Sequence, residues 1–106
     1  MSTKLRSKMI TPTSEVNKCF PRGKKVRVNV RSHVHFGYFI DIPGIEIRGL
    51  IETVLLEPSE KPNLEIGSTI EAVILQFRDS KEPLKRQFRL TVHPAVLANP
   101  ALVKPI

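Results

Sequence analysis

The sequence predicts an all-β protein, a single domain whose five short strands close into a Greek-key barrel. The chain has 106 residues, which is room for one hydrophobic core but not for a second. Five short segments alternate apolar and polar residues, the period of half-buried strands. No segment keeps a helical period over the roughly 10 to 15 residues that the helices of an α/β fold need. A barrel is the simplest arrangement, because closing a small sheet hides edges that a short chain has little else to cover with.

Each strand is expected where the alternation is clearest. The first begins at Lys24, and the others are expected over residues 37–42, 45–51, 68–78 and 86–92. Gly49 interrupts the third segment, and Pro43–Gly44 marks a turn before it. A short helical turn is expected around residues 53–56, in the long connection that follows. The side chains predicted to face the core are Val26, Val28, Val30, Tyr38, Ile40, Ile42, Ile70, Ala72, Ile74, Phe88, Leu90 and Val92.

The chain divides into three parts by composition. Residues 1–21 are rich in Ser, Thr, Lys and Pro without a sustained period, so we expect a flexible basic N-terminal arm there. Residues 22–93 are the barrel domain. Residues 94–106 are a proline-rich tail that is expected to lie on the surface.

The positive charge is concentrated at one end of the chain. The protein has 17 Lys and Arg against 10 Asp and Glu, a net charge of +7. Residues 1–35 hold nine of the basic residues and a single acid, Glu15, whereas residues 36–106 hold eight basic residues and nine acids. This asymmetry is typical of a chain that meets a polyanion at one end, and nucleic acid is the expected partner. A soluble tail beside a solvated strand face is the alternative.

Cysteine content and hydropathy indicate a protein of the reducing cytoplasm. Cys19 is the only cysteine, so an internal disulfide is excluded. No apolar run approaches the ~18 residues of a membrane span, and the N-terminal segment lacks the apolar stretch of a secretory signal. Its basic, acid-poor composition leaves a transit peptide open as an alternative. Neither a membrane nor a small-molecule substrate is an expected partner.

Catalysis and metal binding find little support in the sequence. It contains no recognisable Ser-His-acid arrangement, glycine-rich phosphate loop or paired-ligand motif. His33 and His35 are two residues apart, but His93 stands beside a proline and no carboxylate or thiol has a matching spacing. We therefore expect no enzyme activity, no cofactor and no metal.

Two phenylalanines stand out because alternation places at least one of them in solvent. If Ile40 and Ile42 face the core, Phe39 points the other way. Phe36 sits at the strand end, where its direction is less certain. An exposed ring offers a surface on which a base stacks, worth ~1–3 kcal/mol per base. The alternatives are that Phe39 packs against the arm or a loop, or joins a protein interface.

Basic side chains are expected to flank these rings. Arg27 and Arg31 lie on the outer face of the first strand, and Lys25 lies at its entrance. His35 directly precedes Phe36 and is placed to stack or to contact phosphate. Cations beside exposed rings suit a groove that follows a nucleic-acid backbone, whereas an ordinary solvated strand face is the alternative.

Several short motifs follow one another in a recognisable order: Phe36-Gly37-Tyr38-Phe39-Ile40-Asp41-Ile42, Gly49-Leu50-Ile51, Glu65-Ile66-Gly67, the segment from Ala72 to Asp79, and Arg89-Leu90-Thr91. Their order and spacing resemble the S-one RNA-binding domain family, an OB-fold repeat. The resemblance covers residues 23–93. It implies a five-stranded OB-fold Greek-key barrel that binds RNA on one face.

The resemblance also implies where the binding residues lie. The family uses two aromatics, a His after Gly-Leu-aliphatic, an acid, and an Arg on the last strand. By position these fall on Phe36 and Phe39, on Glu52 in place of the His, on Asp79 or its neighbour Arg78, and on Gln87 in place of the Arg, with Arg86 and Arg89 beside it. The loop between the fourth and fifth strands is long and carries Lys81 and Lys85.

The predicted function is that of a non-catalytic module that binds RNA or single-stranded nucleic acid with low sequence preference. A role in translation, on the ribosome, or in RNA metabolism is expected. The alternative is a protein-interaction module that docks to a ribosome, polymerase or nuclease partner. The residues predicted to contact nucleic acid are Lys25, Arg27, Arg31, His35, Phe36, Phe39, Lys85, Arg86 and Arg89.

Overall fold

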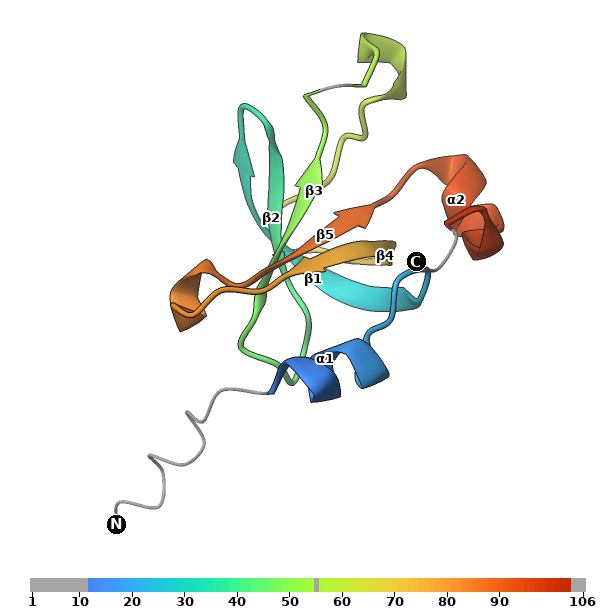
Figure 1. The fold of residues 1–106 in the computed structure, drawn as a ribbon. Helices are drawn as coiled ribbons and strands as arrows, with labels where there is room; N and C mark the ends of the chain where they lie inside the picture. The colour runs from blue at the N-terminus through green and yellow to red at the C-terminus, as the bar shows by residue number, and fades with distance from the viewer. Residues whose placement is uncertain (1–11, 55, 104–106) are drawn as a thin grey trace.

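Five strands close into a barrel in the order β1-β2-β3-β5-β4 (Figure 1). The computed structural model describes residues 12–54 and 56–103. The strands are β1 (Lys25–Val34), β2 (Gly37–Asp41), β3 (Arg48–Glu52), β4 (Thr69–Arg78) and β5 (Gln87–Thr91). Strands β3 and β5 pair in parallel, all other pairs are antiparallel, and β1 pairs with both β2 and β4. The predicted all-β class and five-stranded OB-type barrel are confirmed.

The core is built by the alternation that the sequence displays. Val28, Ile40 and Phe88 are completely buried inside the barrel. Gly49 occupies an inward position of β3, where an added Cβ would strike the Ile40 and Leu90 side chains. The glycine that interrupts the third segment is therefore required by packing, and the strand continues through it.

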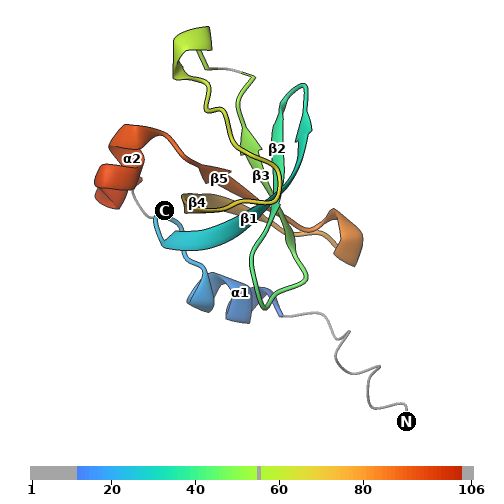
Figure 2. The same cartoon turned by 180° about the vertical axis from the view of Figure 1, so that it is seen from behind.

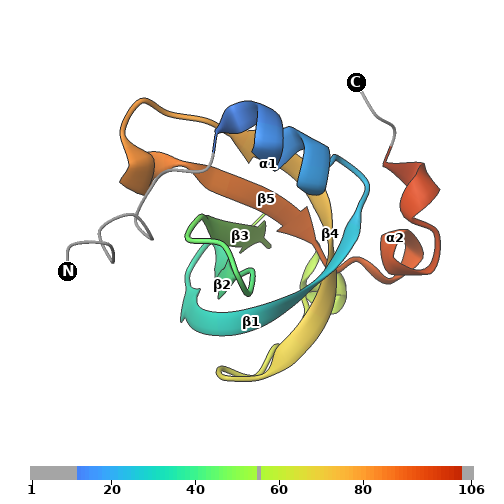
Figure 3. The ribbon, with the colours of Figure 1, turned by 90° about the horizontal axis from the view of Figure 1, so that it is seen from below.

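The C-terminal part of the predicted arm is folded, which corrects the expectation for this segment. Residues Thr13–Cys19 form helix α1, and Val16 on that helix is completely buried in the core. Phe20 packs edge-on against Phe88, with ring centroids 5.5 Å apart. Helix α1 lies against strands β4 and β5 (Figure 3). A helix of seven residues is too short to display its period in the sequence, and residues 1–11 lie outside the described part of the chain.

The connections differ from expectation in detail. The third strand begins at Arg48 instead of Ile45, although Ile47 still packs in the core from the preceding loop. The turn expected around residues 53–56 is marked by a hydrogen bond from Leu56 N to Thr53 O at 3.1 Å. The 3₁₀ turn η2 (Pro58–Glu60) follows it.

Two further segments project from opposite sides of the barrel (Figure 2). One is the β4–β5 loop with its 3₁₀ turn η3 (Pro83–Lys85), and the other is the C-terminal segment. The predicted tail contains helix α2 (Pro94–Ala98) and turn η4 (Pro100–Leu102), and it ends, as far as it is described, on the buried Val103. No helix within residues 12–54 and 56–103 has the length and apolar character needed to cross a membrane.

Candidate nucleic-acid interface

Phe36 and Phe39 form an aromatic pair on the outside of the barrel. Their ring centroids lie 6.0 Å apart at an angle of 89°. Both rings are half-buried, and neither belongs to the core cluster. Phe39 points outward because its neighbours Tyr38 and Ile40 point inward. The direction predicted for Phe39 is confirmed, and the structure adds that Phe36 shares its surface.

The tight hairpin between β1 and β2 sets the position of Phe36. His35 and Phe36 form the two-residue turn that is closed by the Val34–Gly37 pair. Gly37 has a positive φ of 155°, and a Cβ there would run into the carbonyl oxygen of Ile51. The Phe36 carbonyl accepts a hydrogen bond from Thr53 N at 3.0 Å. The turn is therefore held against the end of β3.

Three arginines lie on the strands next to the aromatic pair, and one of them, Arg48, contacts a ring. The guanidinium of Arg48 lies 5.5 Å from the centre of the Phe39 ring. Arg31 Nη1 contacts Asp41 Oδ2 at 2.9 Å. Arg89 Nη1 contacts Glu52 Oε1 at 3.2 Å. We call the surface formed by Phe36, Phe39, Arg31, Arg48 and Arg89 the aromatic face.

The two ion pairs neutralise the carboxylates of this face without locking the arginines. Arg31 is 67% exposed and Asp41 40% exposed, and exposed pairs of this kind contribute only ~0–1 kcal/mol. A phosphate can therefore replace Asp41 at small cost, whereas Arg89 is only 25% exposed and is held more firmly, by Glu52 and by Gln87. A hollow of about 280 Å³ lies between β1, β2 and β3, lined by Arg31, Ser32, Phe39, Asp41 and Arg48.

Arg48 is a functional candidate that the sequence reasoning missed. Its Cα lies opposite Asp41 across the β2–β3 pair, two pairs along from the Phe39–Leu50 pair, which makes Arg48 a diagonal neighbour of Phe39. A residue opposite or diagonal to another across two strands lies within reach of a long side chain. The register that brings Arg48 to Phe39 is set by the loop after β2, and the sequence gives no independent measure of that register.

Lys25 and Arg27 lie apart from the aromatic face. Their half of β1 pairs with β4, where their Cα partners are Val73 and Glu71. Only the second half of β1, which contains Arg31, pairs with β2. The sequence placed Arg27 and Arg31 together because both point outward, but β1 changes its neighbour between them. We call the surface of Lys25, Arg27 and Glu71 the β1–β4 flank.

Arg86 was expected at the interface, but its side chain is buried, with 3% exposed. Its Nε donates to Asp79 Oδ1 at 2.9 Å, and its guanidinium lies 5.1 Å from the centre of the Phe77 ring. Nη1 is buried without an acceptor among the described residues, a situation that costs ~1–3 kcal/mol in a folded protein. Counting in twos from Phe88 already assigns Arg86 to the inner side, a signal available in the sequence.

Asp79 ties helix α1 to the β4–β5 loop. Its carboxylate accepts hydrogen bonds from the Thr13 hydroxyl, from Ser80 N and from Arg86 Nε. These bonds hold the pKa of Asp79 below its ordinary value of 3.8. The Thr13 hydrogen bond has the largest effect, followed by the hydrogen bond from Ser80 N. The acid expected from the family pattern is therefore a structural anchor, and its neighbour Arg78 points to the outer surface.

A hollow of about 310 Å³, which we call the loop pocket, lies beside the aromatic face under the β4–β5 loop. Its cationic lining is Arg48, Arg78, Lys85 and Arg86. Lys85 pairs with Glu82 at 3.3 Å, and both side chains are more than two-thirds exposed. Arg48 lines both this pocket and the hollow at Phe39, so the two hollows are neighbours that share one cation.

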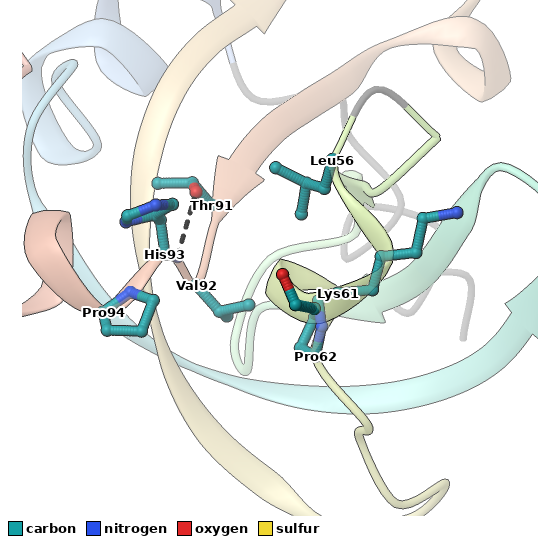
Figure 4. Close-up of a pocket in the computed structure, with 8 residues that line it drawn as sticks. Leu56, Lys61, Pro62, Thr91, Val92, His93 and Pro94 are labelled. Carbon is teal, nitrogen blue, oxygen red and sulfur yellow. Dashed lines mark hydrogen bonds between the residues drawn. The ribbon is translucent and has the colours of Figure 1, made fainter.

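Another pocket, of about 450 Å³, lies between the β3–β4 connection and the end of β5 (Figure 4). Leu56, Pro62 and Val92 give it a largely apolar wall. Lys61 extends away from Thr91 and His93. The backbone N–H of His93 donates a hydrogen bond to the Thr91 hydroxyl at 3.1 Å. Cations do not converge here as they do in the loop pocket. In residues 12–54 and 56–103, no three His, Cys, Asp or Glu side chains gather as metal ligands would.

Comparison with known proteins supports the fold and does not identify a family. No family model matches the chain, and no curated protein matches it. Among solved structures, a multidomain protein with nucleic acid binding domains from Streptococcus pneumoniae matches 81% of this chain with a TM-score of 0.53 and 17% sequence identity. The match spans 30% of that protein. At this identity the likeness shows a shared fold, an all-β barrel of the OB type.

Proposed function

We propose that this protein binds single-stranded RNA or DNA across the aromatic face, with low sequence preference. The observation that carries the proposal is the outward pair of Phe36 and Phe39, 6.0 Å apart, with Arg48 over one ring and two further arginines on neighbouring strands. Every base has a flat face that stacks on a phenyl ring, and every strand has phosphates that attract guanidinium groups. Neither contact reads base identity, hence the low preference.

Arg48 enlarges the stacking surface. Its guanidinium lies over the Phe39 ring, and a guanidinium plane stacks on bases as it does on phenyl rings. A base that approaches Phe39 therefore meets a ring and a cation together. The neighbouring structure named for nucleic acid binding domains supports the same class of ligand.

The S-one relationship remains part of the proposal. Glu52 occupies the position where that family has a His, and Gln87 the position of its last-strand Arg. Glu52 is paired with Arg89, and Arg89 Nε also donates to Gln87 Oε1 at 3.0 Å. Arg89 therefore supplies, beside Gln87, the cation that the family pattern expects on the last strand, and it offsets the charge of Glu52.

The proposal includes a non-catalytic role in translation or RNA metabolism, in the cytoplasm. These parts rest on the sequence: on the resemblance to an RNA-binding repeat and on the single cysteine, Cys19. They are tested separately from binding, by locating the tagged protein in cells and by sequencing the RNA that crosslinks to it.

Binding is tested by titrating labelled oligo-U and oligo-A of about eight nucleotides, a length within the range of one OB barrel. We expect similar affinities for the two sequences and a steep loss between about 50 mM and 200 mM salt, because each neutralised phosphate releases counterions. Absence of binding at the lower salt, or binding that salt does not change, contradicts the proposal.

Docking to a protein is the second candidate function. Leu84, at the tip of the β4–β5 loop, is 97% exposed and lines the loop pocket, so a protein partner that docks there would bury this side chain. A complex recovered from cell extract that persists after nuclease treatment and is lost in Leu84→Ser favours this candidate. A complex that nuclease removes favours nucleic-acid binding.

A further inference from the structure

The loop pocket combines four cationic side chains in a space of about 310 Å³. Arg48 enters it from β3, Arg78 from the end of β4, and Lys85 and Arg86 from the segment that leads into β5. Like charges repel one another less when a counterion lies among them, so four cations in a small hollow attract an anion strongly.

The only carboxylate that lines the loop pocket, among the described residues, is already engaged. Asp79 accepts from Thr13, Ser80 and Arg86, so it cannot also neutralise Arg48 and Arg78. Lys85 has Glu82 as a partner, but this pair is exposed and easily exchanged. The pocket therefore keeps an excess of positive charge.

Arg86 provides a second and independent indication of a ligand. Its side chain is 97% buried, Nε is fixed by Asp79, and Nη1 has no acceptor among the described residues. A buried donor without an acceptor is rare in folded proteins. An oxyanion is the class of ligand that offers several acceptors together with compensating charge.

We propose that the loop pocket is a phosphate-binding subsite. It holds a phosphate of the same nucleic-acid strand whose base stacks on Phe39. The link to the strand rests on the proposed function, whereas the affinity for phosphate follows from the pocket alone. Arg48 joins the two sites because it lies over the Phe39 ring and also lines the pocket. The phosphate belongs either to an internal phosphodiester or to a phosphorylated strand end.

The test compares Arg78→Gln with Arg27→Gln, which removes the same charge from the β1–β4 flank. Both arginines are exposed strand residues, so neither change is expected to disturb folding. Arg86 is left intact because its side chain supports Asp79 and Phe77. The probes are oligo-U of about eight nucleotides, with hydroxyl or phosphate ends, and inorganic phosphate.

We expect Arg78→Gln to weaken oligo-U binding about tenfold, the effect of one lost charge-assisted hydrogen bond. The slope of log affinity against log salt concentration should become shallower by ~0.7, the value for one phosphate contact on a single-stranded nucleic acid. Arg27→Gln should leave both the affinity and this slope unchanged. A loss confined to phosphate-ended strands identifies a terminal phosphate, and a loss with both kinds of end identifies an internal one. Equal effects of the two substitutions overturn the proposal.

Inorganic phosphate separates failure of this proposal from failure of the proposed function. Titrated into nitrogen-labelled protein, it should shift the Nε–H signals of Arg78 and Arg86 in a saturable way, and Arg78→Gln should weaken the response. That result supports the pocket even if no oligonucleotide binds. If the Nε–H signals of Arg78 and Arg86 do not shift, the pocket is not a phosphate site, even if the aromatic face binds oligonucleotides.

Discussion

The aromatic face and the β1–β4 flank both carry outward-pointing cations, but only the aromatic face sets its cations beside exposed rings. On the aromatic face, Arg48 lies over the Phe39 ring and Arg31 lies beside it, paired with Asp41. On the flank, Lys25 and Arg27 face solvent from the half of β1 that pairs with β4. The described part of the chain places no aromatic pair there.

Under the proposed function, positive charge alone does not define the site. Charge attracts any polyanion from a distance and is screened by salt. A flat ring beside that charge adds a contact that only an unpaired base can make. We therefore expect substitutions on the two surfaces to have different effects even when they remove the same charge.

The largest effect is expected from the ring itself. Phe39→Ala should reduce the affinity for oligo-U by ~1–3 kcal/mol, the contribution of one stacked base, in a fluorescence anisotropy titration. Phe39→Trp, which keeps a flat ring, should retain binding. Because Phe39 is half-buried outside the core, the fold should survive both changes. Unchanged affinity in the alanine variant would remove stacking from the mechanism.

The cation over the ring should matter next. Arg48→Gln should weaken binding about tenfold, because it removes a phosphate contact and a stacking plane together. Arg27→Gln serves as the control of equal charge, and its affinity should match that of the unaltered protein. Matching losses in the two variants would mean that a diffuse field, and not the geometry of the aromatic face, drives binding.

A smaller effect of opposite sign is expected from Glu52. Glu52→Gln removes a negative charge from the aromatic face and releases Arg89 for phosphate. Affinity at low salt should rise about two- to fivefold, in keeping with the modest strength of exposed charge interactions. Glu71→Gln, on the β1–β4 flank, should leave the affinity unchanged. A loss of affinity in Glu52→Gln would instead assign the carboxylate a direct contact with a base.

The smallest effect concerns stability in acid. The pKa of Asp79 lies below its ordinary value of 3.8 in the folded protein, chiefly because of the Thr13 hydroxyl. Ionised Asp79 therefore stabilises the fold above about pH 4, and this stabilisation is lost as the pH falls through the lowered pKa.

Thr13→Ala should move the Asp79 pKa back toward its ordinary value, measured by carbon NMR of the carboxyl group. Ser14→Ala, on the next residue of the same helix, is the control. Identical titrations of Asp79 in the two variants would show that helix α1 does not anchor the β4–β5 loop through this bond.

Most of the fold could be predicted from the alternation of apolar and polar residues along the strands. It assigned Val28, Ile40 and Phe88 to the core and Phe39 to the surface, because in a strand the direction of each side chain follows from its neighbours. Helix α1 was not predicted because its seven residues bury a single side chain, Val16, so the sequence contains no repeat of buried positions to detect.

The candidate site was less predictable than the fold because it depends on contacts between strands. Arg48 reaches Phe39 through the register of β2 and β3, and Arg27 is separated from Arg31 by the change of partner along β1. Neither feature is encoded in a local pattern. Arg86 is different, since alternation from Phe88 points it inward, and the resemblance to a family with a last-strand arginine outweighed that local signal.

The most direct measurement is an NMR titration of isotope-labelled protein with oligo-U, followed at the aromatic and guanidinium side chains. The rings of Phe36 and Phe39 and the Nε–H groups of Arg31, Arg48 and Arg89 should shift together on binding, while Arg27 stays unchanged. Shifts centred on Arg27 and Lys25, or none at the two rings, would contradict binding on the aromatic face.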